Sequence, residues 1–269
     1  MGKVLAVTII VIAIVSAIPV VMHTWEAPAD ISTHGHMIDD QMSETMIEAG
    51  VSFLAAQIIL AMFIWKFSGP RKTGEVEKIK TFPGGAKGLV LAALILVGAE
   101  VLALGAFGAK AWAAVYFTPP AADSMPIQVQ AGQFAFYFRY PGPDGKFGPI
   151  HPELINEGTQ NLFGLDPEHD VESRDDVVTA EMAIPVNKEI HLLMHAKDVS
   201  HSFYVPALRI HQDFVPGLDL SVHFTATKVG KYEIVCSQLC GLGHYSMRAY
   251  LDVMSPQDFD DWMKKQAAQ

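Results

Sequence analysis

The chain has 269 residues, a hydrophobic fraction of 50% and a formal net charge of −10 at neutral pH. An acidic chain of this kind does not favour a nucleic-acid partner, because surfaces that bind nucleic acids are basic. Most of the hydrophobic excess lies before residue 113, which excludes a uniformly soluble protein and predicts a membrane anchor followed by an outward domain.

Three apolar runs lie at residues 4–22, 47–65 and 88–111, and each is close to or above the roughly 20 residues that a helix needs to cross a bilayer. The connector after the first run is acidic and contains no Lys or Arg, whereas the connector over residues 66–87 is rich in both. Positively charged connectors face the cytoplasm. We therefore expect the acidic connector and everything beyond residue 113 to face outward.

The first run allows two interpretations. Residues 1–25 can be a first transmembrane helix or a signal peptide, since Lys3 followed by an apolar stretch fits both. No clear A-x-A cleavage site follows it, which favours a retained helix. Residues 26–46 are then an outward acidic loop, and residues 47–113 a transmembrane helical hairpin whose cytoplasmic connector is the basic loop 66–87. The anchor has two or three helices, and either choice leaves the later domain on the same side.

Beyond the third run, apolar residues alternate in short segments separated by turn residues. Phe134, Phe136 and Phe138 alternate in one such segment, and we expect them to line one side of a strand. Repeated alternation at period two predicts an all-β domain, a Greek-key barrel of the cupredoxin-like kind, over residues 119–254. This domain has 20 acidic against 11 basic residues from residue 119 onward, so it would attract a basic partner, although a solvated surface has the same composition.

Two further segments complete the outward part. Residues 149–176 are polar, acidic and without clear periodicity, and we interpret them as a long surface loop. Residues 255–269 are predicted to form a C-terminal helix, because Ser255 is a good N-cap and Pro256 suits the first helical position. Phe259 and Trp262 would share its packing face.

The segment CSQLCGLGHYSM, residues 236–247, places two thiols, an imidazole and a thioether within twelve residues. Cys236 and Cys240 are the only cysteines in the chain, so they form a disulfide, a redox thiol pair or a metal site. His244 and Met247 add ligand types that favour copper, because thioethers are soft ligands. His201, which lies in an extended segment 35 residues before Cys236, is the best candidate for a second imidazole.

Two thiolates that bridge two copper ions, each with its own histidine, would use every one of these groups. A tetrahedral zinc site of two Cys and two His would leave Met247 without a role. A disulfide, or a thiol pair that acts in redox chemistry, would leave His201 and His244 without one. The pattern therefore favours a binuclear copper site, and the zinc and thiol readings stay open.

Residues 198–203 (DVSHSF) and 236–247 resemble the signature of cytochrome c oxidase subunit II, the subunit of haem-copper oxygen reductases that carries the CuA centre. The resemblance covers the second and third apolar runs and nearly all of the outward domain. It implies a binuclear copper centre with two imidazole ligands, two bridging thiolates, a weak thioether ligand and one backbone carbonyl. The imidazole ligands would be His201 and His244, and the bridging thiolates Cys236 and Cys240. Met247 would be the thioether ligand, and Gln238 would supply the carbonyl.

The chain departs from this family in three places. Gln238 stands where the family has a glutamate whose carboxylate holds magnesium at the border with subunit I, so that magnesium site is doubtful here. Phe134 stands where the family has the tryptophan that receives electrons, which leaves Phe134 and Phe136 as the candidates for this role. The first apolar run is additional to the two helices of the family.

Asp198, three residues before His201, is a candidate to orient that imidazole ring, or else a surface turn residue.

The resemblance implies an electron-accepting subunit of a terminal oxidase in a bacterial inner membrane, multi-pass, with the copper domain on the outer side. It would take electrons from a c-type cytochrome and pass them to haem in subunit I, where oxygen is reduced with proton translocation. Subunit I and further oxidase subunits would be its partners, and the chain itself would hold no catalytic residue. Two alternatives stay open: a CuA subunit of a nitric oxide reductase, and a membrane-anchored copper chaperone or thiol oxidoreductase.

Overall fold

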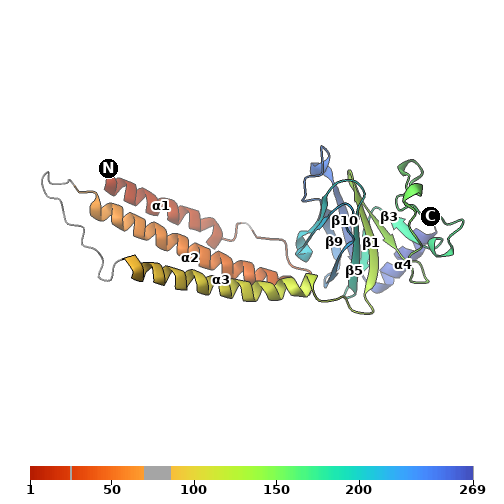
Figure 1. Cartoon of the computed structure of the whole chain (residues 1–269), viewed down its shortest axis with the longest axis horizontal. Helices are drawn as coiled ribbons and strands as arrows, with labels where there is room; N and C mark the ends of the chain where they lie inside the picture. Colours follow the sequence, from red (N-terminus) through yellow and green to blue (C-terminus); the bar gives the residue numbers. More distant parts are fainter. Residues whose placement is uncertain (25, 70–85, 269) are drawn as a thin grey trace. The chain divides into compact units, whose positions relative to one another are not determined.

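A computed structural model of the chain describes residues 1–24, 26–69 and 86–268. The chain divides into two compact units, which are considered separately and are both drawn in Figure 1. One unit comprises Met1–Ala27 and Met37–Lys110, and the other comprises Pro28–His36 and Ala111–Gln269. The basic loop predicted for residues 66–87 lies mostly outside the described residues.

The first unit consists of long apolar helices. They are α1 (Gly2–Val21), α2 (Gly35–Phe67) and α3 (Ala86–Tyr116), and each is long and apolar enough to cross a membrane. The Nζ atom of Lys3 lies 5.3 Å from the ring centroid of Trp65, which links α1 to α2. The Gln41 side chain on α2 donates a hydrogen bond of 3.3 Å to the Leu104 carbonyl on α3. The described residues therefore contain three helices that could span a membrane, the larger number that the sequence allowed.

Two five-stranded sheets form the second unit (Figure 1). The strand order is β3-β2-β1-β5-β8 in one sheet and β4-β10-β9-β6-β7 in the other, which is the predicted cupredoxin-like architecture. The strands are β1 (Met125–Gly132), β2 (Ala135–Tyr140), β3 (Val177–Thr179), β4 (Met182–Pro185), β5 (Glu189–Ala196), β6 (His201–Val205), β7 (Ile210–Phe214), β8 (Leu220–Thr225), β9 (Gly230–Val235) and β10 (Arg248–Met254).

The core lies between the two sheets and follows the alternation of the strands. Phe136 and Phe138 are buried on β2, and the Phe136 ring packs against Phe203 and Phe214 of the opposite sheet. The prediction that Phe134 lies on the same side is wrong. Gly132 pairs with Ala135, so residues 133 and 134 form the tight connection between β1 and β2, and Phe134 is 40% exposed.

The chain between α1 and α2 packs against the sheets of the second unit. We call residues Pro28–His36 the strap. Ile31 of the strap is buried in the core, and its backbone N–H donates to the Ala207 carbonyl at 2.9 Å, while its carbonyl accepts from the Thr227 N–H at 2.6 Å. The acidic loop predicted for residues 26–46 is therefore shorter than expected. Helix α2 already begins at Gly35, whose N–H donates to the Ser32 hydroxyl, so the helix extends well beyond the apolar run.

His34, at the end of the strap, is only 7% exposed, and its Nε2 atom is buried without a hydrogen-bond partner in the described structure. Burial lowers the pKa of His34, and the neighbouring His223 and His36 act in the same direction. Asp30 and the Leu208 carbonyl oppose the shift without cancelling it. The strap is therefore built around a neutral imidazole.

Acid is expected to loosen the strap. Between the usual histidine pKa of about 6.5 and the lower pKa of folded His34, the unfolded strap binds more protons than the folded one, so its stability falls as the pH falls through this window. The protection factors of the Ile31 and Thr227 amides, corrected for the intrinsic exchange rate at each pH, should fall on acidification, and His34→Gln should remove that fall. His169→Gln, at an exposed position, is the control. Equal protection in neutral and mildly acidic buffer would contradict the role of His34.

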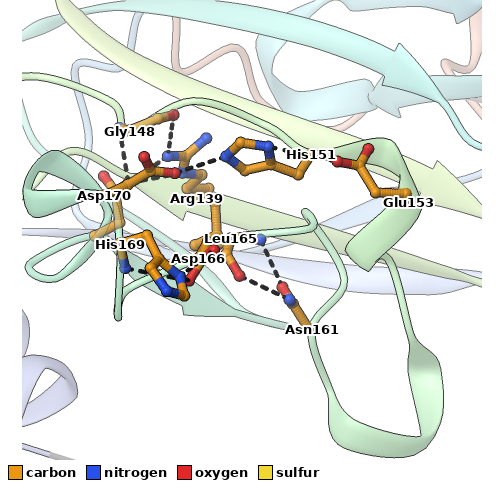
Figure 2. Close-up of polar contacts among 10 residues, drawn as sticks. Arg139, Gly148, His151, Glu153, Asn161, Leu165, Asp166, His169 and Asp170 are labelled. Carbon is orange, nitrogen blue, oxygen red and sulfur yellow. Dashed lines mark hydrogen bonds and ion pairs between the residues drawn. The ribbon is translucent and has the colours of Figure 1, made fainter.

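The long segment between β2 and β3 has an internal structure that the sequence pattern does not reveal. It contains the short 3-10 helices η1 (Pro152–Leu154), η2 (Glu157–Thr159) and η3 (Val171–Ser173). Figure 2 shows how polar contacts fold it: the His151 ring bonds Asp170 at 2.6 Å, and Asn161 exchanges two hydrogen bonds of 2.8 Å with the Leu165 backbone. Phe163 is buried, so this segment is a packed part of the domain.

Arg139 of β2 joins this segment to the sheet. Its guanidinium pairs with Asp176, donates to the Gly148 carbonyl at 2.6 Å and to the Gln128 side chain at 2.9 Å, and neither charged side chain of the pair is exposed to solvent (Figure 2 shows the contact with Gly148). Burial raises the pKa of Asp176, while the Arg139 guanidinium beside it opposes that rise. The pair holds the long segment at the position where β3 begins.

The second unit ends in helix α4 (Pro256–Ala267), which packs on the sheets. The Ser255 hydroxyl accepts a hydrogen bond of 3.2 Å from the Asp258 N–H and caps its first turn. Phe259 and Trp262 both pack against Tyr140, with ring centroids 6.4 Å and 5.3 Å away. Helix α4 thereby covers the sheet that contains β2.

Candidate metal centre

The candidate ligands come from two neighbouring strands of one sheet. His201 is the first residue of β6, and Cys236 follows directly after β9, which is hydrogen-bonded to β6. Cys240, His244 and Met247 lie in the connection from β9 to β10, which we call the ligand loop (residues 236–247). Gly241 in this loop has a φ of 133°, a conformation that side chains disfavour, and it lets the chain turn directly after Cys240.

The side chains predicted as ligands converge on the two sulfur atoms. The Sγ atoms of Cys236 and Cys240 lie 3.9 Å apart, and both thiols are free. Cys236 Sγ is 4.0 Å from Nδ1 of His201 and 3.2 Å from the Gln238 carbonyl oxygen. Cys240 Sγ lies 3.7 Å from His244 Nδ1 and 3.8 Å from the Met247 sulfur. The structure thus brings the other four predicted donors around the pair of thiols.

Burial makes this a dry site. His201 and Met247 are buried, and Cys236 and Cys240 are 8% and 3% exposed. Burial raises the pKa of the Cys240 thiol to about 11, and the adjacent Cys236 contributes to the rise. Because a thiol must lose its proton to bind a metal, metal binding here releases protons.

Asp198 orients the first imidazole. Its Oδ1 atom lies 2.8 Å from Nε2 of His201, which leaves Nδ1 directed at Cys236. Burial opposes ionisation of Asp198, but hydrogen bonds from His201 and from the N–H groups of Gln133 and Val199 outweigh it and lower the pKa. The contact is the carboxylate–histidine arrangement that fixes ligand rings in metal sites.

The arrangement fits a metal bound by both thiolates. Ligand atoms of His201, Cys236 and Cys240 all lie within 4.8 Å of one another. With a metal–thiolate distance of about 2.3 Å, one ion can contact two sulfurs as far apart as roughly 4.6 Å, and the observed 3.9 Å lies within that limit. Gln238 is exposed, and its backbone carbonyl oxygen is the atom that lies near Cys236. Its side chain is an amide and therefore supplies no carboxylate to a magnesium site.

Comparison with known proteins agrees with this geometry. The family model for the periplasmic domain of cytochrome c oxidase subunit II matches residues 166–254. The alternative cytochrome c oxidase subunit 2 of Bradyrhizobium diazoefficiens is 29% identical, over 90% of this chain and 84% of its own length. Cytochrome c oxidase subunit 2 of Cereibacter sphaeroides is 25% identical, over 87% of this chain and 77% of its own length. These matches support a subunit of the cytochrome c oxidase subunit II type.

The resemblance predicted from residues 198–203 and 236–247 is thereby confirmed, and these relatives are named as subunits of an oxidoreductase complex. The family to which they belong implies copper binding, electron transport and association with other oxidase subunits. Among solved structures, the periplasmic domain of subunit II of the Bradyrhizobium japonicum cytochrome oxidase is 28% identical. The match covers 55% of this chain and 96% of the Bradyrhizobium japonicum domain, with a TM-score of 0.41.

The two candidate electron-accepting residues of this chain lie in different environments. Phe136 is 1% exposed and belongs to the core, where no docking partner touches it. Phe134 is partly exposed, and its ring lies over the ligand loop, since a Cβ atom built on Gly243 would come within 2.5 Å of it. Of the two candidates, Phe134 is therefore the one that is partly exposed and lies against the ligand loop.

Sequence reasoning missed one residue of the site. The Gln133 side chain donates a hydrogen bond of 2.6 Å to the Cys240 carbonyl, 107 residues away in the chain. Its position directly before Phe134, a candidate electron-accepting residue, was the one signal that could have drawn attention to it.

Proposed function

We propose that this chain holds two copper ions between Cys236 and Cys240 and is the electron-accepting subunit of a terminal oxidase. A c-type cytochrome is the proposed donor, and haem in subunit I the proposed acceptor. The observation that carries the proposal is the buried pair of free thiols 3.9 Å apart, with an imidazole beside each sulfur. Two coppers that share thiolates supply one-electron transfer with little change in geometry.

The residues of the chain support electron transfer and no bond chemistry. Four further donors surround the thiol pair, and both cysteines are buried. Asp198 holds the ring of His201, so the ligand positions are fixed before any electron arrives. Reduction of oxygen and proton translocation are assigned in this proposal to the partner subunit.

The charge of the connectors supports an outward-facing domain on a bacterial inner membrane. The three helices anchor the chain, and the connector between the second and third is basic in sequence. Long apolar faces of α2 and α3 are exposed in the isolated chain, which suits contact with lipid and with subunit I.

The thiol oxidoreductase alternative is less well supported. Catalytic redox cysteines are accessible and have a lowered pKa. Here both thiols are buried, and the pKa of Cys240 is raised to about 11. The CuA subunit of a nitric oxide reductase would share every feature of this site, and the identity of the co-purifying catalytic subunit distinguishes the two.

The test is a low-temperature electron paramagnetic resonance spectrum of the purified full-length chain, loaded with copper and partly oxidised. An unpaired electron shared by two copper nuclei gives a seven-line hyperfine pattern, and we expect it together with about two coppers per chain. A four-line spectrum with one copper, or a zinc-containing protein without a signal, would contradict the binuclear centre.

A further inference from the structure

We infer that Gln133 is a positioning residue of the metal centre, which fixes the connection between β1 and β2 onto the ligand loop. The inference rests on the proposed binuclear copper function and assigns to it a residue outside the ligand set. It concerns residues 132–135, which we call the hairpin tip, and their contacts with the two segments that carry the ligands.

Gln133 contacts both ligand-bearing segments. Its side-chain amide donates to the carbonyl of Cys240 at 2.6 Å. Its backbone N–H donates to Oδ2 of Asp198 at 2.8 Å, and the other carboxylate oxygen of Asp198 bonds the His201 ring at 2.8 Å. Gln133 is thus connected to Cys240 through the carbonyl of that residue, and to His201 through the carboxylate of Asp198.

The glycines of the ligand loop make this contact possible. A Cβ atom on Gly241 would lie 2.9 Å from the Gln133 amide nitrogen and 3.2 Å from the Phe134 ring, and one on Gly243 would lie 2.5 Å from that ring. The hairpin tip is therefore pressed against the chain between Cys240 and His244. The Phe134 ring covers the ligand loop on one side and is partly exposed on the other.

The hairpin tip is rigid enough to act as a support. Its two-residue connection joins strands that pair up to Gly132 and Ala135, and β1 also pairs with β5 from Met125 to Ala131. The ligand loop has no regular structure apart from one short 3-10 turn at His244–Ser246. Without the Gln133 amide, the Cys240 carbonyl loses this partner, and the segment that aims Cys240 and His244 loses its contact with the sheet.

The experiment compares three forms of the assembled oxidase: the natural chain, Gln133→Leu and the control Gln257→Leu. Leucine has a similar size and no amide. Gln257 lies exposed on α4, so the control makes the same chemical change far from the site. Each form is examined for its copper-to-chain ratio, hyperfine pattern, reduction potential of the copper and rate of reduction by a c-type cytochrome.

We expect Gln133→Leu to keep two coppers per chain, to show altered hyperfine splitting and a shifted potential, and to be reduced about two- to tenfold more slowly, the size of effect that one lost hydrogen bond has. The control should match the natural chain. If Gln133→Leu does not assemble, Gln133→Asn replaces it, because asparagine remains polar but is one methylene too short to reach the Cys240 carbonyl.

An unchanged spectrum and potential in the Gln133 variant would overturn the inference, whatever the reduction rate. A slower reduction with unchanged spectrum would place Gln133 in donor docking alone and would also overturn it. Failure of the proposed function looks different, because the natural chain would then lack the seven-line pattern before any substitution is made.

Discussion

Cys240→Ser is expected to abolish the shared copper signal and to stop electron transfer through the subunit. The Cys240 sulfur is the atom on which the site converges, since it contacts Cys236, His244 and Met247. A serine hydroxyl is a harder ligand than a thiolate and does not ionise near neutral pH, so it cannot bridge two copper ions. The seven-line spectrum should disappear, and oxygen consumption by the assembled oxidase should fall to background.

The matched control is Ser246→Ala in the same loop, where an exposed hydroxyl bonds the Gly243 carbonyl and contacts no candidate ligand. It tests whether any change in the loop is harmful. The copper-to-chain ratio of Cys240→Ser separates loss of one copper from collapse of the whole site. Near-normal oxygen consumption in Cys240→Ser would contradict the binuclear assignment.

The ligands could be predicted from sequence because they are close together along the chain. Cys236, Cys240, His244 and Met247 share one loop, and only His201 comes from elsewhere. The sequence offered His201 only as the best candidate for a second imidazole, and the structure places it at the start of β6, next to β9. The residues that support the site have no such signature, since the contact of Gln133 with the Cys240 carbonyl spans 107 residues. A glutamine at a hairpin tip is common in any sequence, and only the fold shows what it touches.

The same limit explains the errors in the fold. Hydropathy located the three apolar runs, but the start of α2 depends on Ser32, which accepts a hydrogen bond from Gly35 outside the apolar run. The pairing of Ile31 with Ala207 and Thr227 is equally non-local. Phe134 was assigned to a strand face because alternation continues through it, whereas the register of β1 with β2 places it in the connection.

Among the substitutions considered, Arg139→Met is expected to cause the largest decrease in the free energy of unfolding. The buried Arg139 guanidinium lies over the rings of Phe147 and Phe163, at 5.1 Å and 6.0 Å from their centroids, and pairs with Asp176. Methionine can fill much of this space but leaves the Asp176 carboxyl buried without its cation, and breaking a buried pair in this way costs about 3–5 kcal/mol. The measurement is denaturant unfolding of the purified full-length chain, followed by near-ultraviolet circular dichroism.

The double substitution Arg139→Met with Asp176→Leu separates the two parts of this effect. It removes the uncompensated carboxyl, so a large part of the lost stability should return, as is observed when buried pairs are replaced by apolar groups. Arg174→Met is the control, because Arg174 is exposed and donates only to the backbone carbonyls of Pro167 and Glu168. If Arg139→Met were no more destabilising than Arg174→Met, the buried pair would not be what holds the long segment to the sheet. The Phe147 and Phe163 contacts would then have to supply that stability.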